Sequence, residues 1–291
     1  MLAAIAGRFA LEGEYLGAER YDGGHINDTY FASYRLNGSV TRYVHQRINT
    51  RVFQDAHALA RNVSYVTAHM RSKLLARGIG DVERRVLQIV RTRDGHDLLV
   101  TKQGEHWRTY VFVEGTASRT RVESAGDAYA AAFAFGEFAA LLADLPVSRL
   151  HETIPGFHDT PARYARFAQA AADDVCGRAK AAQAEAAQAH HLAHLAPALI
   201  RFAAENGVPL RATHNDTKIT NVLFDARSGD AVCVVDLDTV MPGLTLYDAG
   251  ELIRTAATRS AEDEPDARNV VVEPELLDAV LAGSRAARRR L

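Results

Sequence analysis

Two neighbouring segments in the second half of the chain constrain its fold more than any other feature. Residues 213–221 read THNDTKITN, which places Asp216 five residues before Asn221, and the apolar run at 232–235 is followed directly by Asp236. We expect a polar loop and then a strand that ends in an acid. Kinase-type phosphoryl transfer requires this order of groups, because it needs an acceptor for the substrate's hydroxyl proton and then two oxygen ligands for Mg²⁺.

Each residue of this motif has a predicted role. Asp216 is the candidate catalytic base, which orients the attacking hydroxyl and takes its proton late in the reaction. Asn221 and Asp236 are the candidate ligands of Mg²⁺, a hard cation that prefers oxygen. Lys218 is placed to offset the charge of the transferred phosphoryl group, and Asp238 faces the same side as Asp236 if the strand continues. The alternative is a polar loop and a hairpin that carry acids by coincidence.

A second motif, at residues 21–30, contains the adjacent glycines Gly23 and Gly24. Without side chains they let backbone N–H groups approach phosphates between two strands. No Walker-type GK[ST] sequence follows. A simple Gly-Gly turn is the competing interpretation, and the motif downstream favours a phosphate loop.

The third strand of a kinase-like sheet should carry a cation for the nucleotide phosphates. Arg47 is the nearest candidate, because no lysine is present there. The acidic partner on the next helix stays open, since Asp55 lies close to the helix start and Glu83 is the first glutamate to follow. A surface arginine on an edge strand is the alternative.

The chain divides into a strand-rich part and a helical part. Asn37-Gly38 separates two β-like runs and predicts a hairpin. We expect a β-rich lobe over residues 1–114 and a helical lobe over residues 115–291, with a hinge near 113–115. The expected strands are 31–36, 43–48, 86–90, 97–101 and 107–113, and the expected helices are 54–76, 123–145, 163–196 with a break near Cys176-Gly177, and 197–206.

Composition excludes several classes of protein. The net charge of −2 provides no electrostatic case for nucleic-acid binding. Only two cysteines occur, at 176 and 233, which fits a reducing compartment and argues against a disulfide framework. No segment is long enough to span a bilayer or to act as a signal sequence. We therefore expect a cytoplasmic protein, a monomer or weak dimer, without a membrane or nucleic-acid partner.

Taken together, the motifs resemble those of the aminoglycoside phosphotransferase/choline kinase-like superfamily. Within it, the chain looks most like the group of N-acetylhexosamine 1-kinases. The residues that carry the resemblance span most of the chain: 24–30, 46–49, 107–112, 151–155, 174–179, 213–218, and 236–243 with 246–248.

This resemblance implies a two-lobed, protein-kinase-like α+β fold. It implies a kinase that uses ATP and Mg²⁺ to phosphorylate the anomeric hydroxyl of N-acetylglucosamine or N-acetylgalactosamine. By motif position, the resemblance implies that Asp216 is the catalytic base and that Asn221 and Asp236 are the metal ligands. The nucleotide phosphates would lie under Gly23, Gly24, His25, Asn27 and Thr29, and the adenine would meet the backbone at Phe112, Val113 and Glu114.

The resemblance stops after Gly283, whereas its relatives continue through further helices. We therefore expect a copy truncated at its C-terminus, with exposed apolar surface. Two alternatives to a sugar kinase stay open. One is a kinase for another hydroxyl acceptor, such as an aminoglycoside, choline or homoserine, for which Asp173, Asp174 and the acids at 262–266 are the candidate contacts. The other is an inactive, truncated nucleotide-binding remnant.

Overall fold

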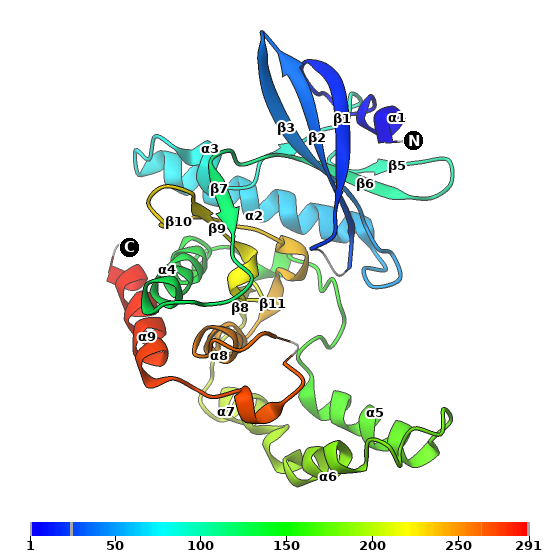
Figure 1. Ribbon diagram of the computed structural model, residues 1–291, viewed down its shortest axis with the longest axis vertical. Helices are drawn as coiled ribbons and strands as arrows, with labels where there is room; N and C mark the ends of the chain where they lie inside the picture. The colour runs from blue at the N-terminus through cyan, green and yellow to red at the C-terminus, as the bar shows by residue number, and fades with distance from the viewer. Residues whose placement is uncertain (1, 24–25, 263, 290–291) are drawn as a thin grey trace. The chain divides into compact units, whose positions relative to one another are not determined.

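The structure is a computed structural model that describes residues 2–23, 26–262 and 264–289 (Figure 1). The chain forms two compact units. The first contains Met1–Thr153 and Arg211–Leu291, and the second contains Ile154–Leu210. The predicted lobe boundary at residue 114 lies inside the first unit and stays a prediction.

The first unit begins with a six-stranded antiparallel sheet in the order β1-β2-β3-β6-β4, with β5 also pairing to β6. Its predicted hairpin is present, because Asn37 (φ 49°) and Gly38 (φ 81°) both adopt the left-handed conformation that such a turn requires. The strands are β1 Glu14–Tyr21, β2 Asp28–Leu36, β3 Ser39–Arg47, β4 Ile89–Val90, β5 Leu99–Val100 and β6 His106–Val111.

Two of these strands are shorter than the apolar runs that predicted them. The run at 86–90 pairs only through β4, because Val86 still closes the short helix α3 (Val82–Arg85) through its N–H bond to Val82. The run at 97–101 pairs only through β5, and the Asp97 carboxylate at its start accepts hydrogen bonds from Ser64 and Arg91.

Helices lie against this sheet. Helix α1 (Leu2–Ala6) contributes Ile5 to a cluster with Phe9, Leu99 and Trp107. Helix α2 (Ala56–Ala76) begins where the Asp55 side chain accepts the N–H of Ala58 at 2.8 Å. This cap occupies Asp55, so the structure does not use it as the partner of a sheet cation.

The remainder of the first unit holds two small antiparallel sheets and three longer helices. Strands β7 (Thr116–Ser118), β9 (Val222–Asp225) and β10 (Ala231–Val234) form one sheet, and β8 (Arg211–Thr213) pairs with β11 (Met241–Gly243) in the other. The short 3₁₀ helices are η1 Val147–Arg149, η3 Ile219–Asn221, η4 Leu237–Thr239 and η5 Ala267–Asn269. The longer helices are α4 Ala125–Leu141, α8 Thr245–Ala256 and α9 Pro274–Arg289.

Helix α9 packs closely on α4. A Cβ atom at Gly283 would collide with the Tyr129 carbonyl oxygen, and one at Gly136 would lie 2.6 Å from the Ala287 Cβ. Ala287 is fully buried in this contact. The segment before α9 does expose apolar surface, at Val270, Val271 and Val272.

We predict opposite effects of one substitution at two helical glycines. Gly283→Ala should lower the free energy of unfolding by about 1–3 kcal/mol, because the added methyl group meets backbone that cannot move freely. Gly250→Ala in α8 should raise it by about 0.5–1 kcal/mol, because no atom lies within 4 Å of the added methyl group. Urea denaturation of both variants checks this, and a stable Gly283→Ala protein would contradict the α4–α9 packing.

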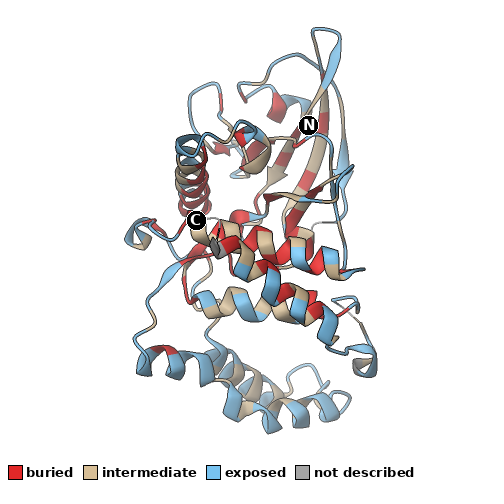
Figure 2. Ribbon diagram, turned by 90° about the vertical axis from the view of Figure 1, so that its left-hand side faces the viewer, coloured by how far each residue is buried: buried red, intermediate tan, exposed pale blue. Residues whose placement is uncertain are grey.

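The second unit is small and helical. It contains α5 (Thr160–Asp173), α6 (Gln183–His191), η2 (Ala193–Leu195) and α7 (Ala198–Glu205). The predicted break near Cys176-Gly177 is present, because Asp174 (φ 41°) and Gly177 (φ 63°) leave the helical conformation. Neither α5 nor α6 contains a buried residue, as the pale helices of Figure 2 show.

Candidate active site

The predicted catalytic loop connects β8 to β9 and ends in η3. Asn215 adopts a left-handed conformation (φ 65°), and its side-chain amide donates to the Thr239 carbonyl at 2.9 Å. The Thr239 hydroxyl in turn donates to the His214 carbonyl at 2.7 Å. These reciprocal bonds connect the catalytic loop to the η4 turn, so the two segments of the sequence motif lie side by side.

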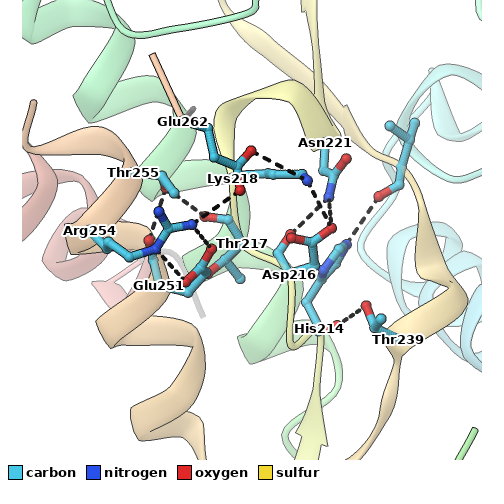
Figure 3. Close-up of polar contacts among 11 residues, drawn as sticks. His214, Asp216, Thr217, Lys218, Asn221, Thr239, Glu251, Arg254, Thr255 and Glu262 are labelled. Atoms are coloured by element: carbon cyan, nitrogen blue, oxygen red, sulfur yellow. Dashed lines mark hydrogen bonds and ion pairs between the residues drawn. The ribbon is translucent and has the colours of Figure 1, made fainter. Parts of the chain in front are cut away.

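The structure brings Asp216, Lys218 and Asn221 together (Figure 3). The Asn221 Nδ2 donates to the Asp216 carbonyl and to its Oδ2, each at 2.9 Å. The Lys218 Nζ lies 3.6 Å from the same Oδ2. Both of these bonds use the side-chain nitrogen of Asn221, so the side-chain oxygen, Oδ1, takes no part in them. The arrangement presents a carboxylate, an ammonium group and an amide oxygen to one small region.

Asp236 joins this group through the backbone. The Val235 N–H donates to the Asn221 carbonyl at 2.9 Å, which places Asp236 beside Asn221. Asp236 is exposed to solvent, although many protein atoms surround its carboxylate. That surrounding and the carboxylates of Asp238 and Asp216 raise the pKa of Asp236, although Arg108 and Lys218 oppose the rise. A bound cation would relieve this concentration of negative charge.

These oxygen ligands suit a Mg²⁺ ion that is bound together with a nucleotide better than a metal ion held by protein side chains alone. Within the described part of the chain, no group of three or more His, Cys, Asp or Glu side chains is placed to hold a metal ion. Mg²⁺ usually binds through one or two carboxylates together with substrate phosphates. Asp236 and the Asn221 amide oxygen could therefore hold the ion when a nucleotide supplies the remaining ligands.

His214 has a structural role that the sequence did not reveal. Its ring is fully buried between Phe135 and Phe138, and its Nε2 lies 3.0 Å from the Val235 carbonyl. Burial lowers the pKa of this imidazole, which favours a neutral ring that donates from Nε2. His214 thus connects the catalytic loop to the backbone just before Asp236, and its position two residues before Asp216 was the available signal.

Asp248, in the first turn of α8, holds the loop from the other side. Its carboxylate accepts the backbone N–H of His214 at 2.9 Å and that of Asn215 at 2.7 Å. Asp248 therefore ties down the predicted catalytic loop, and it is not the N-cap of α8, because Leu244 occupies that position.

Asp248→Ala should lower both stability and turnover. It leaves two buried N–H groups without their acceptor, at a cost of about 1–3 kcal/mol each. The backbone preceding Asp216 then loses its anchor, so kcat should fall more than the KM for nucleotide rises. Thermal denaturation and steady-state kinetics measure both effects. Asp248→Asn, which keeps one acceptor oxygen, should lie between wild type and Asp248→Ala; equal values for the two variants would contradict this role.

Asp238 does not share the orientation of Asp236. The strand ends at Val234, Asp236 is left-handed (φ 57°) and a 3₁₀ turn follows, so the alternation expected from a continuous strand is lost. The buried Asp238 carboxylate instead meets the Arg108 guanidinium, with Nη1 and Oδ1 2.5 Å apart. It also accepts a 2.6 Å hydrogen bond from the Asn27 Nδ2.

The predicted phosphate loop is described in part. Gly24 and His25 lie outside the described residues. At Gly23, a Cβ atom would meet the ring end of Tyr21, an exposed side chain that would have to move aside. Asn27 joins Asp238 to the backbone N–H of Asn49, and the Thr29 hydroxyl accepts a 3.0 Å bond from the Gln46 Nε2. The end of this loop therefore contacts the turn that carries Asp236.

Arg47 is not among the residues that meet at Asp236. Its guanidinium pairs with Asp28, at 2.5 Å, and with Glu105, at 2.7 Å, and it is partly exposed. The neighbouring Gln46 faces Arg108 instead. A nucleotide contact by Arg47 stays a prediction, and its acidic partners come from strand β2 and from the residue just before β6 rather than from a helix.

The predicted hinge is ordered by side-chain contacts. The Arg42 guanidinium lies 3.8 Å from the centre of the Phe112 ring and pairs with Glu114. Phe31 meets Phe112 edge to face at 5.4 Å, and Val113 is buried. The backbone at 112–114 thus runs beside the aromatic rings of Phe31 and Phe112, which suits a planar base, and the adenine contact stays a prediction.

A small cavity of about 90 Å³ lies beside Lys218. Its lining residues include Thr120, Thr220, Thr255, Thr258 and Ser260. The charges around it form a chain in which Glu262, which also lines the cavity, pairs with Lys218 at 3.6 Å and with Arg254 at 3.3 Å (Figure 3). Arg254 also pairs with Glu251 at 2.6 Å. Glu251 and Glu262 are thus both paired with cations.

No helix among the described residues combines the length and the apolar character needed to cross a membrane.

Comparison with known proteins gives a family and a fold for the chain. Residues 17–290 match the model of the "Phosphotransferase enzyme family". Among solved structures, an aminoglycoside phosphotransferase from Alicyclobacillus acidocaldarius is 16% identical with a TM-score of 0.62, covering 98% of this chain and 77% of that one.

Two further structures show the same fold. A spectinomycin phosphotransferase, solved in complex with ADP and spectinomycin, is 14% identical with a TM-score of 0.62, covering 97% of this chain and 78% of that one. A choline kinase from Cryptosporidium parvum is 14% identical with a TM-score of 0.52, covering 97% and 76%. The predicted α+β kinase-like fold is confirmed.

Proposed function

Because the chain belongs to the phosphotransferase enzyme family, we propose that it is an ATP- and Mg²⁺-dependent kinase that phosphorylates the anomeric hydroxyl of N-acetylhexosamines. The observation that carries the kinase assignment is the contact of Asp216 with both Asn221 and Lys218. It supplies the base, the cation and the metal-binding oxygen that phosphoryl transfer requires.

The residues would divide the reaction as follows. Asp216 orients the acceptor hydroxyl and takes its proton late, as the acceptor oxygen bonds to the γ-phosphorus and the bond to the ADP oxygen breaks. Lys218 offsets charge on the transferred group. Asn221 and Asp236 would hold Mg²⁺, which screens the phosphates while bound.

The charge balance near Lys218 supports a neutral acceptor. A cationic acceptor, such as choline or an aminoglycoside, needs carboxylates that are free to pair with it. Glu251 and Glu262 are instead paired with Arg254 and Lys218, and threonine and serine residues are among those that line the cavity beside Lys218. An uncharged sugar matches such a lining better. The cavity is smaller than the roughly 300 Å³ of common ligand pockets, so it would hold only part of the acceptor.

An ADP-release assay tests the proposal. Mg-ATP is supplied with N-acetylglucosamine, N-acetylgalactosamine, choline, homoserine or kanamycin. The matched acceptor control is the methyl glycoside of N-acetylglucosamine, which has no free anomeric hydroxyl. Turnover with the free sugars but not with the glycoside supports the proposal. Turnover only with choline, homoserine or kanamycin would show that this compound, and not the sugar, is the acceptor. Nucleotide binding without any turnover would favour the inactive remnant.

A further inference from the structure

We propose that Arg108 is a positioning residue for this phosphoryl transfer. From the sheet, it holds the turn that carries the metal ligand Asp236, by pairing with Asp238 two residues further along. The inference rests on the proposed function and extends it to a residue outside the motif of the catalytic loop. Four features of the structure support it: burial, the hydrogen-bonded row on the sheet, the contacts of the turn, and the choice of strand.

The Arg108–Asp238 pair is buried on both sides. The Arg108 side chain is 4% exposed and that of Asp238 is 3% exposed. Apart from their mutual contact, the Arg108 Nη1 and the Asp238 Oδ1 have no hydrogen-bond partner among the described residues. Removing two charges from water is costly, and one partner left alone in the interior costs more still. Each residue therefore strongly constrains the position of the other.

Arg108 is itself fixed by a row of side chains across three strands. Register places Thr29 of β2 opposite Gln46 of β3, and Gln46 opposite Arg108 of β6. The Gln46 Nε2 donates to the Thr29 hydroxyl, while its Oε1 accepts from the Arg108 Nε at 3.0 Å and Nη2 at 2.8 Å. The guanidinium is thus oriented before it meets Asp238, and one end of the row lies in the predicted phosphate loop.

The turn has little freedom once these contacts form. Both carboxylate oxygens of Asp238 are engaged, one by Arg108 and the other by Asn27. Its backbone carbonyl accepts a 2.9 Å bond from the Thr153 hydroxyl. Asp236, two residues earlier, is held in the left-handed conformation, which is uncommon for a residue with a side chain. Movement of Asp238 would therefore displace the metal-binding carboxylate.

The cation that pairs with Asp238 lies on strand β6 and not on β3, the strand where the sequence predicted a cation. β3 presents Gln46, a neutral residue, on the side of the sheet where Asp238 lies, and Arg47 pairs with Asp28 and Glu105. The positive charge that reaches the turn comes from the adjacent strand β6. Arg108 thus connects the six-stranded sheet to the turn that carries Asp236. Through this connection, Mg²⁺ binding at Asp236 would depend on the position of strand β6.

The test measures ADP binding by calorimetry, with and without Mg²⁺, in Arg108→Gln, Arg108→Lys, Asp238→Asn and the double variant Arg108→Gln/Asp238→Asn. The matched control is Thr109→Val. Thr109 follows Arg108 on β6, is fully buried and contacts His45 at 2.7 Å on the opposite face. Thermal denaturation of every variant reports the loss of stability separately.

We expect Arg108→Gln to weaken Mg-ADP binding about tenfold or more and metal-free ADP binding less than about threefold. Arg108→Lys should recover only part of the loss, because lysine keeps the charge without the planar fork. The double variant should bind better than the two single losses predict, since contacting residues couple. Thr109→Val should lower stability and leave both binding constants within about twofold of wild type.

Three results would overturn the inference: equal losses with and without Mg²⁺, additive losses in the double variant, or unchanged binding by a folded Arg108→Gln protein. If the wild-type chain binds no nucleotide at all, the proposed function fails and this inference fails with it. If wild type binds Mg-ADP but phosphorylates no acceptor, only the proposed activity fails, and the binding comparison still decides the role of Arg108.

Discussion

Asp216→Asn is expected to lower kcat by about 10²–10⁴-fold, while the affinity for Mg-ATP stays within about twofold. The amide is nearly isosteric with the carboxylate, and its oxygen can still accept the bond from the Asn221 Nδ2. It cannot take a proton from the acceptor hydroxyl. The loop should therefore keep its structure and lose its base, so that the variant binds nucleotide normally and turns over slowly.

Single-turnover kinetics with Mg-ATP separates these two effects. Asp144→Asn provides the matched control, because it makes the same chemical change at an exposed carboxylate that pairs with Lys73 and His69. It should leave kcat and nucleotide affinity near the wild-type values. If Asp216→Asn retained more than about a tenth of wild-type turnover, another group would have to accept the proton.

Asp236→Asn is expected to reduce kcat/KM for Mg-ATP by about 10³-fold, which corresponds to about 4 kcal/mol of transition-state stabilisation. The reason is the loss of the charged metal ligand. The backbone should tolerate the change, because asparagine adopts the left-handed conformation of this position more readily than most residues. The variant should therefore fold and bind metal-free ADP, but gain little affinity when Mg²⁺ is added.

Titration of ADP binding with Mg²⁺ provides the direct measurement. Asp230→Asn, in the exposed loop between β9 and β10, is the control and should show the wild-type response. An Asp236→Asn protein that kept the full effect of Mg²⁺ would assign the metal to other ligands. Loss of binding in both the presence and absence of Mg²⁺ would instead indicate a disrupted site.

Local signals in the sequence predicted the elements that depend on local physics. Asn37-Gly38 forms its predicted hairpin because both residues tolerate positive φ, and Asp55 lies at the start of the predicted helix as its cap. The order of Asp216, Asn221 and Asp236 was also readable, since one short loop and one hairpin carry all three. The apolar runs at 86–90 and 97–101 overestimated their strands, because Val86 closes α3 and only Leu99 and Val100 of the second run pair with β6.

The partners of the site residues were not readable in the same way. Asp238 followed Asp236 in a pattern that suggested a shared face, but the strand ended earlier and its carboxylate turned to Arg108. Arg108 lies within an apolar strand pattern at 107–113, where nothing marks it as the cation of the turn. Arg47 was the more conspicuous candidate, and its own ion pairs leave it away from Asp238.

The sequence by itself determined the strand-rich and helical parts, the polar loop with its candidate base and metal ligands, and the turns that need particular residues. All of these depend on interactions between residues close along the chain. Only the tertiary structure decided which cation meets the metal-ligand turn and which groups orient it. Asn27 and Asp238, for example, are separated by 211 residues. Their contact, like the burial that makes the Arg108–Asp238 charges depend on each other, exists only after distant segments have packed together.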